Sequence, residues 1–183
     1  YTLGPLKMKL MKQLIYVLAA GLFAVSCSNP NATLVTFDDE NTVAIRAHIQ
    51  NYLENDVASM TERWSEDLVV KGSTLDGAVD LAVAQSAISL HHVLFSDISI
   101  TAPDSDEDFY AETTTYKDSG ETWTKIWFSW NGTGNFTGNT VSNMNMIGFR
   151  WADGKIAEEH HFSDGAAFAA EVAAFEASQS AAE

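Results

Sequence analysis

The spacing of apolar residues changes in the middle of the chain, near Phe95. Before Phe95, apolar residues recur at the three- and four-residue spacing of an amphipathic helix. After it, they alternate with polar residues, as in a strand that buries one face, and turn residues separate the segments. Helices followed by a run of strands predict an α+β domain, with helices packed on one face of a curved antiparallel sheet.

The expected elements follow in chain order. A first helix begins at the acidic residues Asp38–Glu40, runs to Met60 and breaks near Asn55. Residues 64–70 are interpreted as a helical turn that enters a strand, and a second helix begins at Ser73. The remaining elements are strands over residues 96–102, 109–117, 122–130, 140–151 and 155–162, and a last helix over residues 164–177.

The first 27 residues have the pattern of an export signal. Lys7, Lys9 and Lys12 precede an uncharged apolar run, 14–25, that is shorter than the roughly 20 residues needed to span a bilayer. The small residues before Cys27 resemble the cleavage site of bacterial lipoproteins, which predicts an acylated Cys27. The alternative is an ordinary signal peptide with an incidental cysteine.

This interpretation divides the chain into a signal peptide (1–27), a tether (28–38), one folded domain (39–178) and a short tail (179–183). We therefore expect an exported protein anchored in the bacterial cell envelope, in the periplasm or at the surface. Cys27 is the one cysteine of the sequence, so no internal disulfide is expected.

The mature part is strongly acidic. Loss of the three signal lysines takes the formal net charge from −15 to −18. Nucleic acids and anionic lipids attract basic surfaces, so binding to either is disfavoured. We expect membrane contact through the lipid anchor alone.

The segment from Phe149 to Asp164 resembles the closing strand pair of SnoaL-like proteins of the nuclear transport factor 2-like superfamily. These proteins share an aromatic-Arg-aromatic strand, an Asp-Gly-Lys-Ile turn, and acidic residues two and eight positions after the Ile. Ile156, Glu158 and Asp164 match those offsets. The resemblance implies a cone-shaped sheet with helices over its concave face, a small-molecule pocket and a homodimer. The family includes isomerase-like, cyclase-like, dehydratase and epoxide hydrolase enzymes, beside members without an assigned activity.

The sequence departs from this family at a position that matters for chemistry. Many cyclase-like relatives have Trp and an acid/base Asp four and five residues after the Ile, where this chain has His160 and His161. Imidazole is also competent in proton transfer. Because adjacent strand residues face opposite ways, only one of the two enters the pocket. The resemblance favours His161 with Glu159, which places Glu158, His160 and Phe162 on the other face.

Further candidates come from the helices and from the strand that contains three tryptophans. Asp67 and His91 are the candidate partners of His161 in catalysis, although Asp67 has the alternative of a solvated loop residue. No metal site and no cofactor are expected, since two adjacent histidine pairs offer at most one ligand each to a converging site. The candidate ligand-binding residues, for which core packing is the alternative, are Tyr52, Trp64, His92, Trp127 and Glu159.

Three functions remain open at this point. The first is an enzyme that transfers protons on an apolar, carbonyl-bearing molecule, as an isomerase, cyclase or lyase. The second is a non-catalytic lipoprotein that binds a ligand or a protein. The third rests on a weaker resemblance of residues 160–163 to the His-His strand of metal-independent carbonic anhydrases of the same superfamily.

Overall fold

The computed structural model describes residues 32–181. The predicted signal peptide and Cys27 lie outside the described residues. Within them, no helix is both long and apolar enough to cross a membrane. The elements are β1 (Leu34–Thr36), α2 (Glu40–Leu53), α3 (Val57–Thr61), β2 (Trp64–Gly72), α4 (Leu81–Leu94), β3 (Phe95–Thr101), β4 (Tyr110–Thr115), β5 (Thr122–Gly134), β6 (Thr140–Ala152), β7 (Lys155–Phe162) and α5 (Ala166–Ser180).

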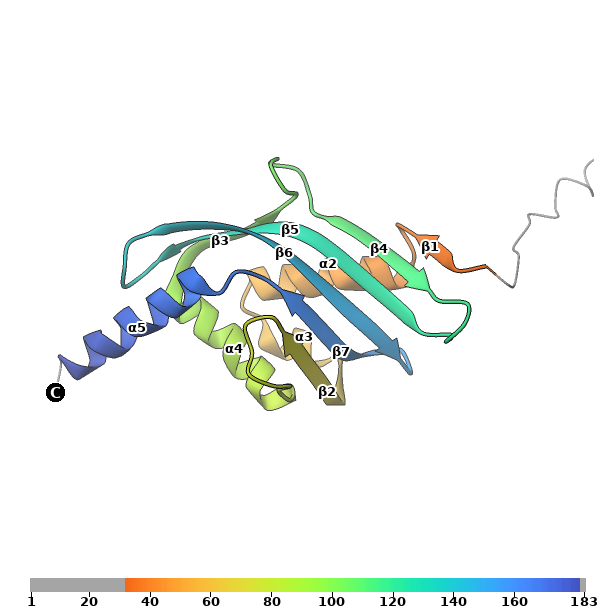
Figure 1. Ribbon diagram of the computed structural model, residues 1–183, viewed down its shortest axis with the longest axis horizontal. Coiled ribbons are helices and arrows are strands. Elements are labelled where there is room, and N and C mark those ends of the chain that lie inside the picture. Colours follow the sequence, from red (N-terminus) through yellow and green to blue (C-terminus); the bar gives the residue numbers. More distant parts are fainter. Residues whose placement is uncertain (1–31, 182–183) are drawn as a thin grey trace, which may run out of the picture. The chain divides into compact units, whose positions relative to one another are not determined.

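The strands form one curved sheet in the order β1-β4-β5-β6-β7-β2, and β3 pairs with the far end of β5. Figure 1 shows the long strands β5 and β6 arching over the helices. Neighbouring strands are antiparallel except β2, which runs parallel to β7, so the sheet is mixed and not wholly antiparallel. Strand β1 lies within the segment predicted to be a tether, where its residues pair with β4.

Two of the helix boundaries are explained by single acidic caps. Asp39 accepts hydrogen bonds from the backbone N–H groups of Asn41 and Thr42 and so starts α2. The predicted break near Asn55 is confirmed, since this residue has a φ of 55° between α2 and α3. The predicted start of the next helix at Ser73 is wrong. Helix α4 begins only after Asp80, whose side chain accepts the Val83 N–H.

The residues just before Asp80 pair with the sheet and are not helical. Val79 pairs with Val70 in an isolated antiparallel bridge, with both N–H···O bonds formed, so this part of the chain extends the edge of the sheet. Residues 64–70 are strand from the outset, but the pairing of β2 with β7 is irregular between Trp64 and Val69. In residues 64–70 and in the residues before Asp80, the spacing of the apolar side chains is compatible with a helix and with a strand.

The core lies between α2, α3, α4 and the concave face of the sheet. Alternation along each strand decides which side chains enter it. On β5, Ile126 and Phe128 are buried against the helices, and Phe149 of β6 and Ile156 of β7 join them. The side chains between these positions point to the outer face, which no helix covers (Figure 1).

Helix α5 is attached to the sheet by a buried carboxylate. Glu171, 1 % exposed, accepts the backbone N–H groups of Phe136 and Thr137 at the turn between β5 and β6. The Phe175 ring packs edge-on against Phe136, and Phe168 packs on Phe95 and on the His91 ring. These contacts place α5 beside the end of α4 that carries His91.

Candidate active site

The Glu-Glu-His-His segment of β7 divides between the two faces of the sheet. On the concave face, His161 Nε2 lies 2.7 Å from Glu159 Oε2. On the outer face, His160 Nε2 lies 2.8 Å from Glu158 Oε1. The predicted assignment of His161 and Glu159 to the helix-covered side is confirmed. One strand therefore presents the same pair of side chains twice, in two environments.

The inner carboxylate is enclosed. Glu159 is 4 % exposed, and its second oxygen, Oε1, accepts the indole N–H of Trp64 at 2.6 Å. Burial alone would raise the pKa of Glu159. The hydrogen bonds from His161 and Trp64, with the charge of His161, outweigh burial and hold that pKa below its usual value. Glu159 is thus an anion that orients His161, and His161 Nδ1 is left to meet a ligand.

The surroundings of His161 are apolar. Across the sheet its row contains Gly72, Ile147, Ile126 and Ala111. None of these carries a charge, so a ligand beside His161 meets hydrocarbon on the sheet side. An apolar setting strengthens the interaction between the imidazole and the Glu159 carboxylate.

His48 of α2 also reaches this carboxylate, and sequence analysis missed it. Its Nε2 lies 3.9 Å from Glu159 Oε1, and its ring packs edge-on against Trp64. The side chain is 2 % exposed, and its buried Nδ1 has no hydrogen-bond partner. Burial lowers the pKa of His48 to about 4, so the imidazole is neutral at pH 7. Its position between Ile45 and Ile49 on the buried stripe was the available signal.

A second polar cluster lies where α2, α4 and β5 meet. Tyr52 Oη lies 3.1 Å from His91 Nδ1 and accepts the indole N–H of Trp130 at 2.7 Å. Burial, and after it the charges of His161 and His92, lower the pKa of His91 to about 4. Burial raises the pKa of Tyr52 to about 12. Both groups are therefore neutral over the physiological range.

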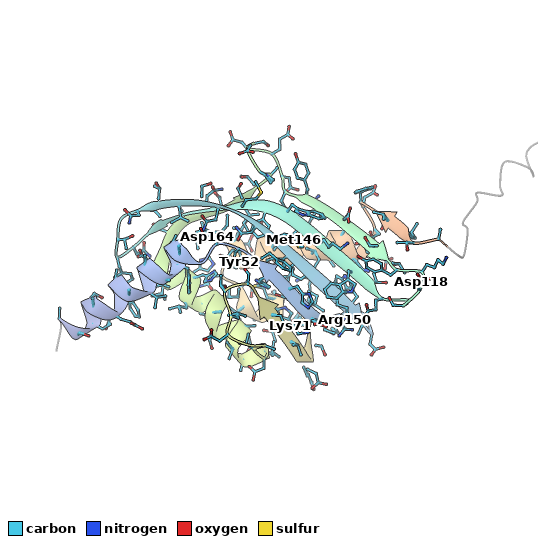
Figure 2. All side chains as sticks on the ribbon, in the orientation of Figure 1. Tyr52, Lys71, Asp118, Met146, Arg150 and Asp164 are labelled. Carbon is cyan, nitrogen blue, oxygen red and sulfur yellow. The ribbon has the colours of Figure 1, made fainter. Side chains whose placement is uncertain are left out.

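The two clusters lie on the same, helix-covered side of the sheet. After burial, the charge of His161 is the next cause of the lowered pKa of His91. Phe168 of α5 lies against His91, with ring centroids 5.0 Å apart. Figure 2 shows the labelled Tyr52 on the helix side of the sheet. The site therefore combines two imidazoles, one beside a buried carboxylate and one beside a phenol.

The other predicted residues are placed as follows. Trp64 holds Glu159, and His92 Nε2 lies 2.7 Å from the carbonyl oxygen of Tyr52, which joins α4 to the end of α2. Asp67 is exposed in the irregular part of β2, where its N–H bonds to Ser65 Oγ, so it does not join His161.

Trp127 is also away from the concave face. It pairs with Tyr110 and Met146 on the outer side of β5, because it is one residue removed from the buried Ile126 and Phe128. The tryptophan of β5 that reaches the concave site is Trp130, which alternation places on the same face as Ile126 and Phe128.

The outer face has its own hollow, of about 440 Å³, between the β4–β5 turn, β5, β6 and β7. Trp123 lies beside His160 in it, with ring centroids 4.9 Å apart. Glu158 bonds to Lys71 and, at 3.0 Å, to Arg150 (Figure 2). The hydrogen bond from Lys71 is the main reason that the pKa of Glu158 falls to about 2, although burial opposes the shift. Among residues 32–181, no group of three or more His, Cys, Asp or Glu side chains is arranged to hold a metal ion.

Comparison with solved structures identifies the fold. A proposed polyketide cyclase, IdmH from Streptomyces antibioticus, matches 74 % of this chain and 99 % of its own, with 15 % identity and a TM-score of 0.54. A nuclear transport factor 2-like protein from Burkholderia xenovorans matches 72 % and 95 %, with 15 % identity and a TM-score of 0.53. A proposed isomerase from Bacillus subtilis matches 66 % and 83 %, with 21 % identity and a TM-score of 0.50.

The chain therefore has the nuclear transport factor 2-like fold, an α+β architecture with helices over a curved sheet. Neither protein-family models nor curated protein sequences match it. At these identities the similarity shows the fold alone, and the chemistry has to be argued from the side chains.

Proposed function

We propose that the concave face binds a small apolar molecule with a carbonyl group and moves a proton on it, with His161 as the base. The observation that carries this proposal is the buried Glu159 carboxylate, which lies 2.7 Å from the partly exposed His161, beside apolar side chains. A carboxylate behind an imidazole fixes its orientation and stabilises the imidazolium that forms when the ring takes a proton.

The reaction balances without a co-reactant. His161 Nδ1 takes a proton from the carbon next to the carbonyl, and the C–H electron pair moves to the oxygen to give an enolate. The imidazolium then returns the proton to another carbon or to oxygen, which gives an isomer of the substrate. We assign the developing oxyanion to His91, the second imidazole on the helix-covered side of the sheet.

The test follows hydrogen–deuterium exchange in deuterated buffer by proton NMR, with a panel of apolar cyclic and aryl ketones. Exchange at the carbon next to the carbonyl, faster with the protein than in buffer and lost in His161→Gln, is expected. If no ketone of the panel exchanges faster than in buffer, proton transfer of this kind is rejected.

The second candidate is a non-catalytic binding protein that uses the outer face. The hollow beside Trp123 favours it, as do the exposed side chains of Tyr110, Met144 and Phe162. The face also carries Lys71, Lys125 and Arg150 in ion pairs with Glu112 and Glu158, in a sequence that is otherwise acidic. Two copies that pair through this charge-balanced face would keep their acidic surfaces apart. We therefore propose a homodimer through the outer face.

We further propose that the protein is exported and anchored through Cys27, on the sequence pattern of residues 7–27. Labelling of cells with an alkyne fatty acid is expected to mark the wild-type protein and not the Cys27→Ser variant. Equal labelling of both would contradict the anchor.

A further inference from the structure

We propose that Tyr52 and Trp130 fix His91 with its proton on Nε2, which makes His91 a hydrogen-bond donor to an oxygen of the ligand and not a second base. Tyr52 and Trp130 are then positioning residues that act through His91. The part that concerns the ligand rests on the proposed function, whereas the tautomer is a property of the protein alone.

The cluster has one donor whose direction is fixed, the indole N–H of Trp130. An indole N–H only donates, so in the 2.7 Å contact Tyr52 Oη must accept from Trp130 Nε1. The phenol still has one proton to donate, and Tyr52 is 6 % exposed. Within the described residues, His91 Nδ1 at 3.1 Å is the acceptor that reaches it. A proton on Nδ1 would leave this buried O–H without a partner, at a cost of about 1–3 kcal/mol.

The chain of donors therefore has one direction. It runs from Trp130 Nε1–H to Tyr52 Oη–H and on to His91 Nδ1. A neutral imidazole that accepts at Nδ1 carries its proton on Nε2. The lowered pKa of His91 agrees with a neutral ring, and the charged groups that lower it are His161 and His92.

The ring is also held in place from both sides. His92, the next residue, is bonded through Nε2 to the Tyr52 carbonyl, which fixes the last turn of α4 on α2. Trp130 and Phe168 pack edge-on or tilted against the His91 ring, at 6.3 and 5.0 Å between centroids. Within the described residues Nε2 makes no hydrogen bond and is not among the fully buried unpartnered atoms, so we assign the ligand contact to this nitrogen.

The two imidazoles of the site then have opposite roles. His161 gives its Nε2 to Glu159 and offers Nδ1 as an acceptor of protons, whereas His91 offers an N–H. A matching ligand presents an acidic C–H to one and an acceptor oxygen to the other. This pairing selects carbonyl compounds that form an enolate, and it disfavours ligands that present only donors, such as amines.

The test is the tautomer of His91, measured by nitrogen-15 NMR on the full-length protein labelled at histidine, at neutral pH and without ligand. The five histidines are assigned by single His→Gln variants. We expect the His91 Nδ1 signal at the unprotonated position and Nε2 at the protonated one. In Tyr52→Phe the two signals are expected to move toward the average of exchanging tautomers, while the Tyr116→Phe control on the outer face leaves them unchanged.

A second measurement needs no variant at Tyr52. In the wild-type protein a correlation across the hydrogen bond is expected between the Tyr52 hydroxyl proton and His91 Nδ1. Trp130→Phe is expected to weaken this correlation. A proton on His91 Nδ1, or signals that do not respond to Tyr52→Phe, overturns the inference. Since no ligand is present, these outcomes are separate from failure of the ketone exchange assay.

Discussion

The inner and outer Glu–His pairs of β7 differ less in their histidines than in what surrounds their carboxylates. The side chains of His161 and His160 are 36 % and 35 % exposed, and each lies within 2.8 Å of its glutamate. On the outer face, Lys71 and Arg150 already neutralise Glu158. On the inner face, Glu159 has a neutral indole and the neutral His48 beside it. Within the described residues, no Lys or Arg pairs with Glu159, so its negative charge is shared between His161 and the more distant His48.

The outer Glu158–His160 pair is therefore an internal control for the proposed catalytic pair, Glu159–His161. Each inner substitution has an outer counterpart of the same chemistry on the opposite face of β7. Because the two environments differ, substitutions in the inner pair should have larger effects than the same substitutions in the outer pair.

The largest difference is expected in catalysis. His161→Gln should reduce ketone proton exchange by about 10²- to 10⁴-fold, the usual contribution of a general base, whereas His160→Gln should leave it within about twofold. Exchange rates measured by NMR on the same ketone give both values. Equal losses in the two variants would remove His161 from its role as base.

The next largest difference is expected in stability. Glu159→Gln removes a buried carboxylate that accepts bonds from Trp64 and His161, and should lower the free energy of unfolding by about 3 kcal/mol. Glu158→Gln acts on a network in contact with solvent and should cost about 1 kcal/mol or less. Urea unfolding of both variants, followed by tryptophan fluorescence, makes the comparison, and a larger loss for Glu158→Gln would reverse it.

A fall in pH from 6.5 to 4 should lower the free energy of unfolding mainly through groups on the inner face. His48 is neutral when folded, with its pKa lowered from 6.5 to about 4, so the unfolded chain binds the extra proton first. The stability that this provides is complete above pH 6.5 and is lost as the pH falls toward 4. His91 contributes in the same direction. Glu159, whose pKa is also lowered, adds a loss at still lower pH, as the pH falls through its folded value.

His48→Leu is the variant that isolates this effect. It should flatten the fall in unfolding free energy between pH 6.5 and 4 by about 2 kcal/mol, whereas His160→Leu should leave the slope nearly unchanged. Urea titrations at a series of pH values provide the measurement. A slope in His48→Leu as steep as in the wild type would show that His48 does not control it.

The smallest effect is expected for association through the outer face. Phe162 is 52 % exposed, and Phe162→Glu should weaken the proposed homodimer by about 10-fold, or about 1.4 kcal/mol. Light scattering over a dilution series measures it. A monomeric wild-type protein at all concentrations would contradict the homodimer.

Sequence alone predicted the strands from β3 to β7 and the division of β7, because period-two alternation and two-residue turns are local signals. It placed His161 beside Glu159 for the same reason. Local signals did not locate the start of α4, since Val79 satisfies a helical stripe but is held by Val70 from β2. They also did not identify His48, whose partner Glu159 is more than 100 residues away along the chain.

The misplaced candidates have the same physical origin. Asp67 was a candidate partner of His161, but an irregularity in β2 turns it to solvent. Trp127 was a candidate ligand-binding residue, with core packing as the alternative. Alternation on β5 assigns that role to Trp130, and only the contact with Tyr52 from α2 distinguishes the two. Long-range pairing decides such cases, and a single sequence does not contain it explicitly.

Glu171 accepts hydrogen bonds from main-chain N–H groups of the β5–β6 turn. Most side chains of this turn can therefore be substituted while α5 stays docked on the sheet. Gly134 is an exception, since a Cβ there would lie 2.3 Å from the Glu171 carboxylate. Shortening the turn would remove its hydrogen bonds to Glu171, and with them the packing of Phe168 on the His91 ring. The length of a remote surface turn thus governs whether Phe168 stays on the His91 ring.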